Sequence, residues 1–561
     1  MQTSNDIAAQ KSLGSRKLRI GLLVDAVSGS KYVYELAQWA SSQNNLVFSH
    51  LLVLHPPVRS DALEGGEHGS SGLAKRLLGV VVAVENLLIR QIPIHCDHLA
   101  DFDLGPLVQN QIAIEPVLLG PGLGFGLSES DIEKIKSSRL DLLIHCGSGT
   151  PRGEMLNAAR LGVIAFHHAG HAVEGGAPAG FWEAFHRAEQ TAFVLSTSSE
   201  STEPGRVLKA GAFATQFFYL LNQAHLCKKA NEHLKALLAA TAALGTLPES
   251  NPQTCAPSLQ QGMPNGHELI MYVCKIAWRI AVKVGRRTIN IRARWRLSFI
   301  HAGWQDSLRC PRTAVANPRG RFLADPFLYT QDGKTYCFAE DYVYRTGRGH
   351  ISAFEVRSES VAALGACLSE PFHLSFPYLF RYGGQLYMCP ETNESDQIRV
   401  YRCKVFPLQW ELAAVLMDGL SAADSMLFEH DGRWWMFTNI DPARIGDHCA
   451  ELYIFSADSP LAGEWTPHPR NPIYIDSQMA RNAGLFRHDG KLYRAAQRQG
   501  FDLYGKGFSI FEVTALTPTH YAERQVASIE ADATRGMKGT HHITSNGSTT
   551  MIDELSFSFV R

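Results

Sequence analysis

The chain has 561 residues, of which 45% are hydrophobic and 19% are charged, and its formal net charge is −1. This length predicts two or three domains with ample core, and the composition is ordinary for a globular protein. A net charge so close to zero gives no field that favours nucleic acid or an acidic partner, so we expect neither.

Targeting and redox signals point to the cytoplasm. The 11 cysteines lack CxxC pairs and zinc-ligand spacing, as expected for reduced thiols. The polar start of the chain has no signal-peptide core. No run reaches the roughly 18–20 uninterrupted apolar residues of a membrane span, and Leu77–Ile92, broken by Glu85 and Arg90, indicates an amphipathic helix.

Residues 17–225 alternate strand and helix signals. Apolar runs at 18–24, 46–54 and 140–146 predict buried strands, whereas 32–42 and 153–160 predict helices. Alternation of this kind indicates an α/β domain with a mostly parallel sheet covered by helices. Ligands of such sheets bind at the carboxyl ends of the strands.

A further strand, Gly162–His168, ends in two histidines and leads into the loop Gly175–Pro178. The strand before it opens into a second glycine-rich loop that contains Cys146, Gly147, Ser148 and Gly149. Because glycine lets the backbone approach a ligand closely, we expect a site where these two strands end.

These motifs resemble the formyltransferases that use 10-formyltetrahydrofolate. That family carries a strand ending Asn-x-His, a Gly-Ala-Ala-Pro-like loop and a later Leu-Asp-x-Gly motif. Here His167 falls on the catalytic histidine, Ala165 on the asparagine and Glu203 on the aspartate. The resemblance implies a Rossmann-like formyltransferase domain in which His167 is the base and Glu203 orients it.

The resemblance also assigns the remaining roles. The oxyanion role of the missing asparagine falls to His168, His171 or a backbone N–H of the glycine loop. The folate, 10-formyltetrahydrofolate, would meet the backbone of Cys146, Gly147, Ser148 and Gly149. One alternative is that His167 is a structural histidine in a fold that has lost its activity. Another is a metal site formed by imidazoles, but no carboxylate or thiolate completes a ligand set, so we predict no metal.

Residues 226–294 read as a helical and Pro/Gly-rich connector. Helices are predicted at 230–244 and 267–284, and the stretch 246–266 between them is typical of a linker. The stretch 275–296 has eight basic residues: Lys275, Arg279, Lys283, Arg286, Arg287, Arg292, Arg294 and Arg296. Because Ile276, Trp278, Ile280 and Val284 are interleaved with these cations, the stretch is either a peripheral contact with the inner face of the membrane or a connector whose charges are solvated.

From Trp295 onward the pattern is all strands with an internal repeat. Turns that end in glycine recur at Asp332-Gly333, Gly383-Gly384, Asp431-Gly432, Asp489-Gly490 and Asn546-Gly547. Each turn is followed by an alternating strand, and the first four are preceded by a matching one, which is a hairpin signature. Five hairpins at this spacing predict an all-β five-bladed propeller over 295–561, so the chain is expected to be multidomain.

The propeller region resembles arabinanase-like glycosidases and, more closely, the N-terminal domain of plant glucosamine inositolphosphorylceramide transferases. The resemblance rests on Phe322–Phe327, Tyr387–Thr392 and His468–Pro472. With the formyltransferase-like part, the chain resembles bacterial fusions of two such domains.

Hairpin geometry predicts a polar mouth at one end of the propeller. In each blade the first strand starts, and the second strand ends, at the same end, because the two are antiparallel. Seven residues after the turn glycines lie Glu340, Glu391, Asn439, Gln497 and Glu554. Eight residues before them lie Asp325, Phe376, Asp424 and Asn482, with His541 or His542 nearby in the fifth blade.

Three interpretations of this mouth stay open. It binds a glycan through Asp325, Glu340, Glu391, Asp424 and Asn482; or it hydrolyses a glycoside; or its acids only cap strands. Hydrolysis needs carboxylates about 5–10 Å apart, with Asp325 as base and Glu391 as acid, but Phe376 stands where a further acid is expected. Candidates for stacking on sugar rings are Trp434, Trp435, Trp465 and Tyr504.

The leading hypothesis at this stage is formyl transfer from 10-formyltetrahydrofolate to an amino sugar in glycan or polysaccharide biosynthesis. The propeller would then hold the acceptor, which is a glycan, a nucleotide-sugar or a lipid-linked glycan. The alternatives are a retired formyltransferase fold with a glycan-binding propeller, and a glycosidase or glycosyltransferase that acts at the propeller mouth.

Overall fold

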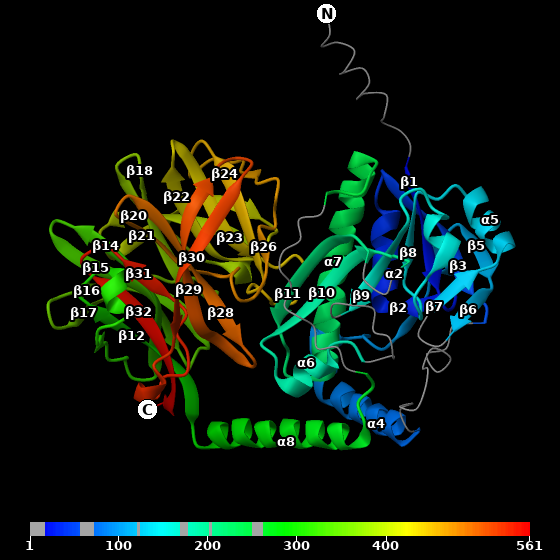
Figure 1. Cartoon of the computed structure of the whole chain (residues 1–561). Helices are drawn as coiled ribbons and strands as arrows, with labels where there is room; N and C mark the ends of the chain where they lie inside the picture. Colours follow the sequence, from blue (N-terminus) through cyan, green and yellow to red (C-terminus); the bar gives the residue numbers. More distant parts are fainter. Residues whose placement is uncertain are drawn as a thin grey trace, which may run out of the picture. The chain divides into compact units, whose positions relative to one another are not determined.

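The computed structural model describes residues 17–56, 72–120, 124–168, 178–200, 205–249 and 262–560. The chain divides into two compact units, Met1–Ile276 and Ala277–Arg561, each of which has its own architecture (Figure 1).

The first unit is built on a seven-stranded sheet with the order β11-β10-β9-β8-β1-β3-β5. Five adjacent strands are parallel: β1 (Leu18–Val24), β3 (Leu46–Leu54), β5 (Asn110–Ile114), β8 (Leu142–His145) and β9 (Val163–His168). The antiparallel strands β10 (Gln190–Thr197) and β11 (Val207–Ala214) complete one edge. This mixed sheet confirms the predicted α/β architecture, but it does not confirm a formyltransferase fold.

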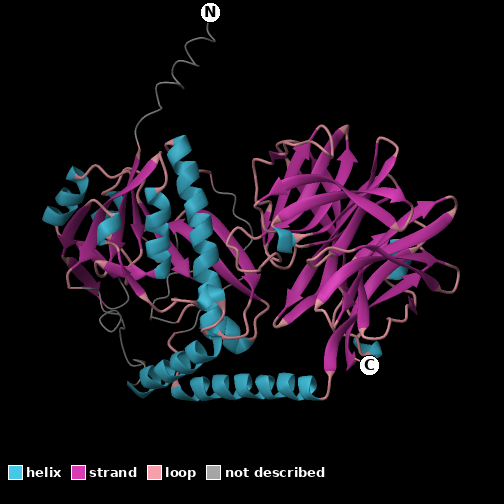
Figure 2. Cartoon of the chain, turned by 180° about the vertical axis from the view of Figure 1, so that it is seen from behind, coloured by secondary structure: helices cyan, strands magenta, loops and turns pink. Residues whose placement is uncertain are grey.

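Helices pack against this sheet and against one another. They are α2 (Lys31–Ser41), α4 (Gly72–Ile89), α5 (Glu129–Ser137), α6 (Phe181–His186), α7 (Tyr219–Leu244) and α8 (Gly266–Thr288). Helix α2 contacts β3 and α7, and α7 also contacts β10 (Figure 2). The segment expected as a helix at 153–160 is instead a short 3-10 helix, Gly153–Asn157. Among the described helices, none is long and apolar enough to cross a membrane.

The second unit is the predicted five-bladed propeller. Blade 1 contains β14 (Arg321–Gln331), β15 (Lys334–Val343), β16 (Arg348–Val356) and β17 (Val361–Leu368). Blade 2 contains β18 (Ser375–Tyr382), β19 (Gln385–Glu391), β20 (Gln397–Val405) and β21 (Gln409–Asp418). Blade 3 contains β22 (Ala422–His430), β23 (Arg433–Ile440), β24 (Glu451–Ala457), β25 (Thr466–Pro467) and β26 (Tyr474–Ile475). Blade 4 contains β27 (Asn482–His488), β28 (Lys491–Gly500), β29 (Leu503–Leu516) and β30 (Tyr521–Glu530).

The fifth blade closes the ring with strands from both ends of the propeller sequence. Its order is β13-β12-β32-β31, where β12 (Ile291–Ile300) and β13 (Thr313–Ala314) come first in the chain, and β31 (Ile543–Ser545) and β32 (Thr550–Phe559) come last. The pairing of β12 with β32 runs from Ile291↔Phe559 to Ile300↔Thr550. Closure of this kind joins the two ends of the propeller sequence within one blade, and the ring leaves only short, protected sheet edges.

The innermost strands share a bulge that sequence periodicity did not reveal. The pairing register shifts between Ala324 and Phe327, and equivalent shifts occur in blades 2, 3 and 4. Asp325, Phe376 and Asp424 occupy these bulges with φ near +49°, +46° and +49°. Because an L-residue rarely adopts this left-handed backbone, the repeated bulge is a built feature that redirects the side chain at the strand entrance.

In the fourth blade the register shifts between Asn482 and Gly484, and Gly484 has a φ of +125°, which differs from the values in the other three bulges. A Cβ added here would lie 2.1 Å from the carbonyl oxygen of Ile543 on the neighbouring inner strand. We expect Gly484→Ala to lower the free energy of unfolding by about 3 kcal/mol or more, because strain and a backbone clash combine. Gly490→Ala is the matched control: φ is +73°, open space surrounds it, and the cost should be about 1–2 kcal/mol. Equal losses in chemical denaturation would show that close packing at Gly484 is unimportant.

Candidate functional site

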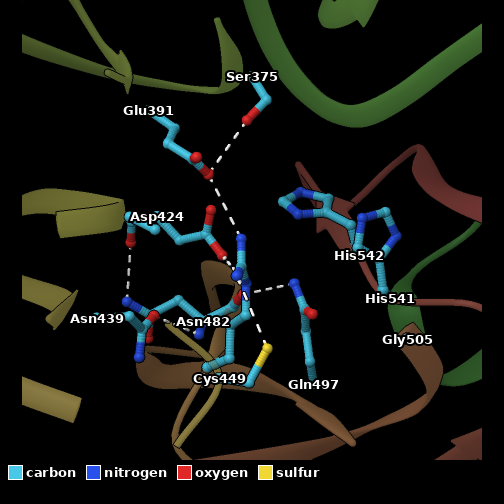
Figure 3. A network of polar contacts seen from close by, with 12 residues as sticks. Ser375, Glu391, Asp424, Asn439, Cys449, Asn482, Gln497, Gly505, His541 and His542 are labelled. Atoms are coloured by element: carbon cyan, nitrogen blue, oxygen red, sulfur yellow. Dashed lines mark hydrogen bonds and ion pairs between the residues drawn. The ribbon is translucent and has the colours of Figure 1, made fainter. Parts of the chain in front are cut away.

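The strand entrances of the propeller bring the five predicted glycan-binding residues into one buried polar cluster. Asp325 and Asp424 come from the bulges of β14 and β22, Glu340 and Glu391 lie on β15 and β19, and Asn482 begins β27. All five side chains are buried. We call this cluster, together with the residues that contact it, the propeller mouth (Figure 3).

One part of the mouth is a histidine held between two carboxylates. His541 Nδ1 lies 2.7 Å from Asp553 Oδ2, and His541 Nε2 lies 3.3 Å from Asp325 Oδ1. Burial lowers the pKa of His541, but Asp553 and Asp325 outweigh it, so the pKa is raised above its ordinary value. The imidazolium therefore supplies positive charge between two acids.

Asp553 is a mouth residue that the repeat count missed. Its Oδ1 accepts hydrogen bonds from the backbone N–H of His541 at 2.9 Å and of His542 at 3.0 Å. Burial raises the pKa of Asp553, yet His541 more than offsets it and the net shift is downward. The predicted neighbour, Glu554, instead pairs with Arg296 at 3.2 Å and Arg312 at 3.0 Å, because adjacent strand residues point to opposite sides.

The second part of the mouth is an arginine fork that sequence reasoning also missed. Arg481 Nε lies 2.7 Å from Asp424 Oδ2, and Arg481 Nη2 lies 3.4 Å from Glu391 Oε2 (Figure 3). Ser375 Oγ donates to Glu391 at 3.2 Å. Burial raises the pKa of Asp424 to about 7 even though Arg481 opposes the shift. The only sequence signal for Arg481 was its position directly before Asn482.

Amide side chains hold the backbone of the mouth in place. Asn482 Nδ2 donates to the carbonyl oxygen of Asp424 at 2.9 Å, and the Asn482 N–H donates to Asn439 Oδ1 at 2.9 Å. Gln497 Nε2 donates to the Asn482 carbonyl oxygen at 3.2 Å. Asn482, predicted to contact a glycan, thus uses its amide N–H to position Asp424.

Glu340 lies in the same electrostatic environment. Burial raises its pKa well above the ordinary value, and the carboxylates of Asp325, Glu391 and Asp553 add to the effect. Burial likewise raises the pKa of Asp325. Several carboxyl groups of the mouth are therefore held toward their neutral, proton-donating form.

An exposed aromatic ring lies beside these polar groups. Tyr504 is 40% exposed as a residue, and its ring lies 5.2 Å from the His541 ring and 5.2 Å from the Arg481 guanidinium. The hydroxyl end points into the mouth, where burial raises the pKa of Tyr504 well above its ordinary value. Trp295 also packs against His541, and the two ring centres lie 4.0 Å apart. The other aromatic candidates, Trp434, Trp435 and Trp465, are buried in the core between strands.

Asp325, His541 and Asp553 also have the spacing of a metal-binding group, with ligand atoms within 4.8 Å of one another. Both ring nitrogens of His541 already face carboxylate oxygens. The three side chains therefore form a charged triad whose potential ligand atoms already face one another.

The titration of Asp424 gives a pH-dependent stability. Its pKa is about 7 in the folded protein and 3.8 in its ordinary state, so the folded state binds more protons between these values. The free energy of unfolding should fall by on the order of 4 kcal/mol from this group as pH rises from about 4 to 8. Denaturant titrations of wild type and Asp424→Asn at pH 5 and pH 8 measure it. We expect the variant to gain on wild type at pH 8; an equal difference at both pH values would contradict the assignment.

The N-terminal candidate residues lie at the carboxyl ends of adjacent strands, as predicted. Ser148 N–H and Oγ donate to Asp25 Oδ2 at 2.8 and 2.7 Å, and a Cβ on Gly147 would lie 2.8 Å from Asp25 Oδ1. Asp25 follows β1 and fixes the loop that contains Cys146 and Gly149. Burial raises the pKa of the Cys146 thiol to about 12.

The proposed catalytic residues of this unit are only partly described. The backbone of His167 and His168 forms the end of β9 and pairs with Val194 and Phe193 of β10. Glu203 lies outside the described residues. The structure therefore places the loop of residues 146–149, whereas the expected pairing of His167 with Glu203 lies outside the described residues.

Comparisons with known proteins concentrate on the propeller. Residues 304–547 match the family "Glucosamine inositolphosphorylceramide transferase 1, N-terminal". Proteins named glucosamine inositolphosphorylceramide transferase 1 are similar in sequence. The one from Oryza sativa subsp. japonica is 34% identical over 285 residues, which cover 48% of this chain and 38% of that protein. The one from Arabidopsis thaliana is 38% identical over 216 residues, covering 37% and 28%. The matched region thus spans 38% of the rice protein and 28% of the Arabidopsis protein.

Solved glycoside hydrolases are also similar in fold. Zg3597, a family 117 enzyme from Zobellia galactanivorans, is 9% identical, with coverage of 47% of this chain and 91% of that chain and a TM-score of 0.33. A thermostable family-43 glycoside hydrolase is 17% identical, with coverage of 43% and 90% and a TM-score of 0.32.

These matches correct the functional hypothesis drawn from the N-terminal motifs. The relatives are named for transfer involving glucosamine and inositolphosphorylceramide, not for formyl transfer from 10-formyltetrahydrofolate. The formyltransferase resemblance of residues 17–225 receives no support, and the prediction of formyl transfer from 10-formyltetrahydrofolate to an amino sugar is wrong. The resemblance of the propeller to the N-terminal domain of the glucosamine inositolphosphorylceramide transferases is confirmed.

Proposed function

We propose that the propeller mouth binds the sugar and inositol-phosphate part of a glycosylated lipid, and that the chain takes part in the assembly of such lipids. The observation that carries the proposal is the position of Tyr504. Its accessible ring lies next to both the His541 triad and the Arg481 fork. An aromatic face beside charged hydrogen-bonding groups is a suitable surface for a sugar ring with its hydroxyls.

The chemistry of the mouth suits a ligand that is rich in hydroxyl groups. Carboxyl groups held near neutrality, such as Asp424, both donate and accept hydrogen bonds. Arg481 and the protonated His541 add charge-assisted donors, which are about twice as strong as neutral ones. A ligand that presents both hydroxyls and phosphate oxygens would use both kinds of partner.

The sequence relatives support a lipid-linked ligand. Their name combines glucosamine with inositolphosphorylceramide, and the match covers their N-terminal family region. Only 38% of the rice protein is matched. For this chain we therefore propose recognition of the lipid headgroup by the matched region, and not the whole activity of that protein. Thermal unfolding in the presence of glucosamine, inositol phosphate and a glucosaminyl inositol phosphate tests it. The combined headgroup should raise Tm most; no shift with any of the three at millimolar concentration would reject the proposal.

A second candidate is glycosyl transfer at the mouth itself. It is favoured by the contrast between Asp325 and Asp553. Burial raises the pKa of Asp325, whereas His541 lowers the pKa of Asp553 below its ordinary value. Acids that are separated in this way commonly divide acid and base roles. Asp325→Asn keeps the shape and tolerates the left-handed backbone, but it cannot transfer a proton. A mouth that only binds should keep its affinity in this variant, whereas a catalytic mouth should lose about 100-fold or more in turnover of a labelled sugar donor.

A further inference from the structure

Helix α4 of the first unit and helix α8, which begins in that unit and runs from Ala277 into the second, each leave an apolar face toward solvent. Helices α4 and α8 share a core with α6 and α7, to which Val81, Ile89, Leu269 and Tyr272 contribute. The hydroxyl of Tyr272 donates to Glu85 of α4, and Glu85 also accepts the Leu220 N–H at 2.9 Å. Figures 1 and 2 both show α4 and the start of α8 along one edge of the first unit. These contacts fix which side of each helix points inward.

The outward side of α4 is apolar. Its exposed residues include Leu73, Val80, Val84, Leu87 and Leu88, and Leu87 is 61% exposed. Positions 73, 80, 84, 87 and 88 fall on one side of a helix with 3.6 residues per turn. The buried Val81, Glu85 and Ile89 occupy the adjacent side.

Helix α8 repeats the arrangement more strongly. Ile270, Val273, Trp278 and Val284 are exposed, and Trp278 is 70% exposed. The outward positions between Ile270 and Val284 are all uncharged, because the cations of this helix lie on other sides. Lys275 Nζ donates to the Phe185 carbonyl oxygen, and Lys283 pairs with Asp502.

This result changes the interpretation of the basic stretch 275–296. The helix ends at Thr288, and residues from Ile291 onward form strand β12. Arg294 donates to the carbonyl oxygens of Pro318 and Arg321, and Arg296 pairs with Glu554, so both belong to the propeller. The exposed feature of the connector is thus an apolar helix face, which the count of basic residues did not predict.

Single exposed apolar side chains are normal, but two neighbouring helices with apolar outward faces mark a binding surface. The charges around this surface identify its partner. Residues 72–92 carry Lys75, Arg76 and Arg90 against one acid, Glu85, which is buried and whose pKa burial raises. Residues 266–288 carry five cations, Lys275, Arg279, Lys283, Arg286 and Arg287, against the single acid Glu268.

An apolar face with a basic surround matches an anionic bilayer. The apolar side chains would enter the boundary between headgroups and acyl chains, and exposed cations near the helix ends, such as Arg90 and Arg287, would meet lipid phosphates. Trp278 suits the interface, where tryptophan is enriched in membrane proteins. A second copy of the chain fits less well, because a two-fold contact would bring the same cations against one another.

We propose that the outward face of α4 and α8 docks on an anionic lipid bilayer. The surface lies in the helices and not in the propeller mouth, so this inference stands whether or not the mouth binds a headgroup. Lipid vesicles that lack any sugar test it separately from the proposed function.

Sedimentation of the full chain with vesicles is the test. We expect it to pellet with vesicles of phosphatidylcholine and phosphatidylglycerol in equal amounts, less with phosphatidylcholine alone, and less at high salt. Leu87→Glu combined with Trp278→Glu should weaken partitioning by about tenfold or more. The matched control, Val405→Glu with Leu412→Glu, adds the same charge at exposed apolar positions of blade 2 and should bind like wild type.

Three results would overturn the proposal. The first is no pelleting of wild type with the anionic vesicles, and the second is unchanged binding by the α4/α8 variant. The third is a concentration-dependent dimer in sedimentation velocity that this variant abolishes, which would assign the face to a second copy. Since the substituted side chains are exposed, circular dichroism should show both double variants folded; as a milder probe, Arg286→Gln with Arg287→Gln should weaken binding to anionic vesicles only.

Discussion

Glu523→Ala is expected to lower the free energy of unfolding of the propeller by about 3–5 kcal/mol, because it leaves a buried guanidinium without its counter-ion. Arg494 is fully buried, and its Nε and Nη2 lie 2.9 and 2.6 Å from the two carboxylate oxygens of Glu523. An arginine cannot escape the loss by deprotonation. Arg494 also donates to the Met479 carbonyl oxygen at 2.8 Å, so the loss should loosen the segment that carries Arg481 into the mouth.

Chemical denaturation measures this effect against a matched surface pair. Glu411 also pairs with an arginine, Arg402, but both side chains are more than a third exposed. Glu411→Ala should therefore leave the free energy of unfolding nearly unchanged, because water already screens this pair. Similar losses for the two variants would mean that burial of the Arg494 pair does not govern its contribution.

Tyr504→Ala is expected to raise the Kd for the glycosyl headgroup about thirtyfold, or ~2 kcal/mol, because it removes the accessible ring beside the two charged clusters. Tyr504→Phe keeps the ring and should bind nearly like wild type. Since Tyr504 is 40% exposed, its truncation should leave the fold intact. Titration calorimetry with a soluble glucosaminyl inositol phosphate gives the affinity of each variant.

Tyr382→Ala is the control for Tyr504. Tyr382 is a tyrosine of similar exposure, 37%, and it lies on β18 against Trp434. Its removal should leave Kd unchanged. A loss of affinity in both variants would indicate a general effect of truncation and not a sugar platform at the mouth.

Much of the propeller could be predicted from its sequence because hairpin turns are local. The five glycine turns set the blades, and counting from Gly333 and Gly384 placed Glu340 and Glu391 at the mouth. Counting could not reveal the bulges at Asp325 and Asp424, because they depend on packing around the propeller axis. Nor could it reveal Arg481, whose role depends on two acids that lie 57 and 90 residues away in sequence.

The first unit shows where motif reasoning failed. The apolar runs predicted its parallel strands, since buried strands have a local signature. The function assigned to the strand end rested on His167, while Ala165 and Glu203 departed from the pattern. A strand end with histidines fits many reactions, so the fold class followed from the sequence and the reaction did not. The apolar residues of α8 had already suggested a membrane contact, but the sequence did not reveal that the helix directs its cations to other sides.

The most direct test of the account is the binding of a glucosaminyl inositol phosphate to the full chain, measured by titration calorimetry for wild type and Tyr504→Ala side by side. Wild type should bind this ligand saturably at one site, and Tyr504→Ala should bind it about thirtyfold more weakly. The proposed function would be contradicted by no binding at millimolar ligand, or by binding that the loss of Tyr504 leaves unchanged.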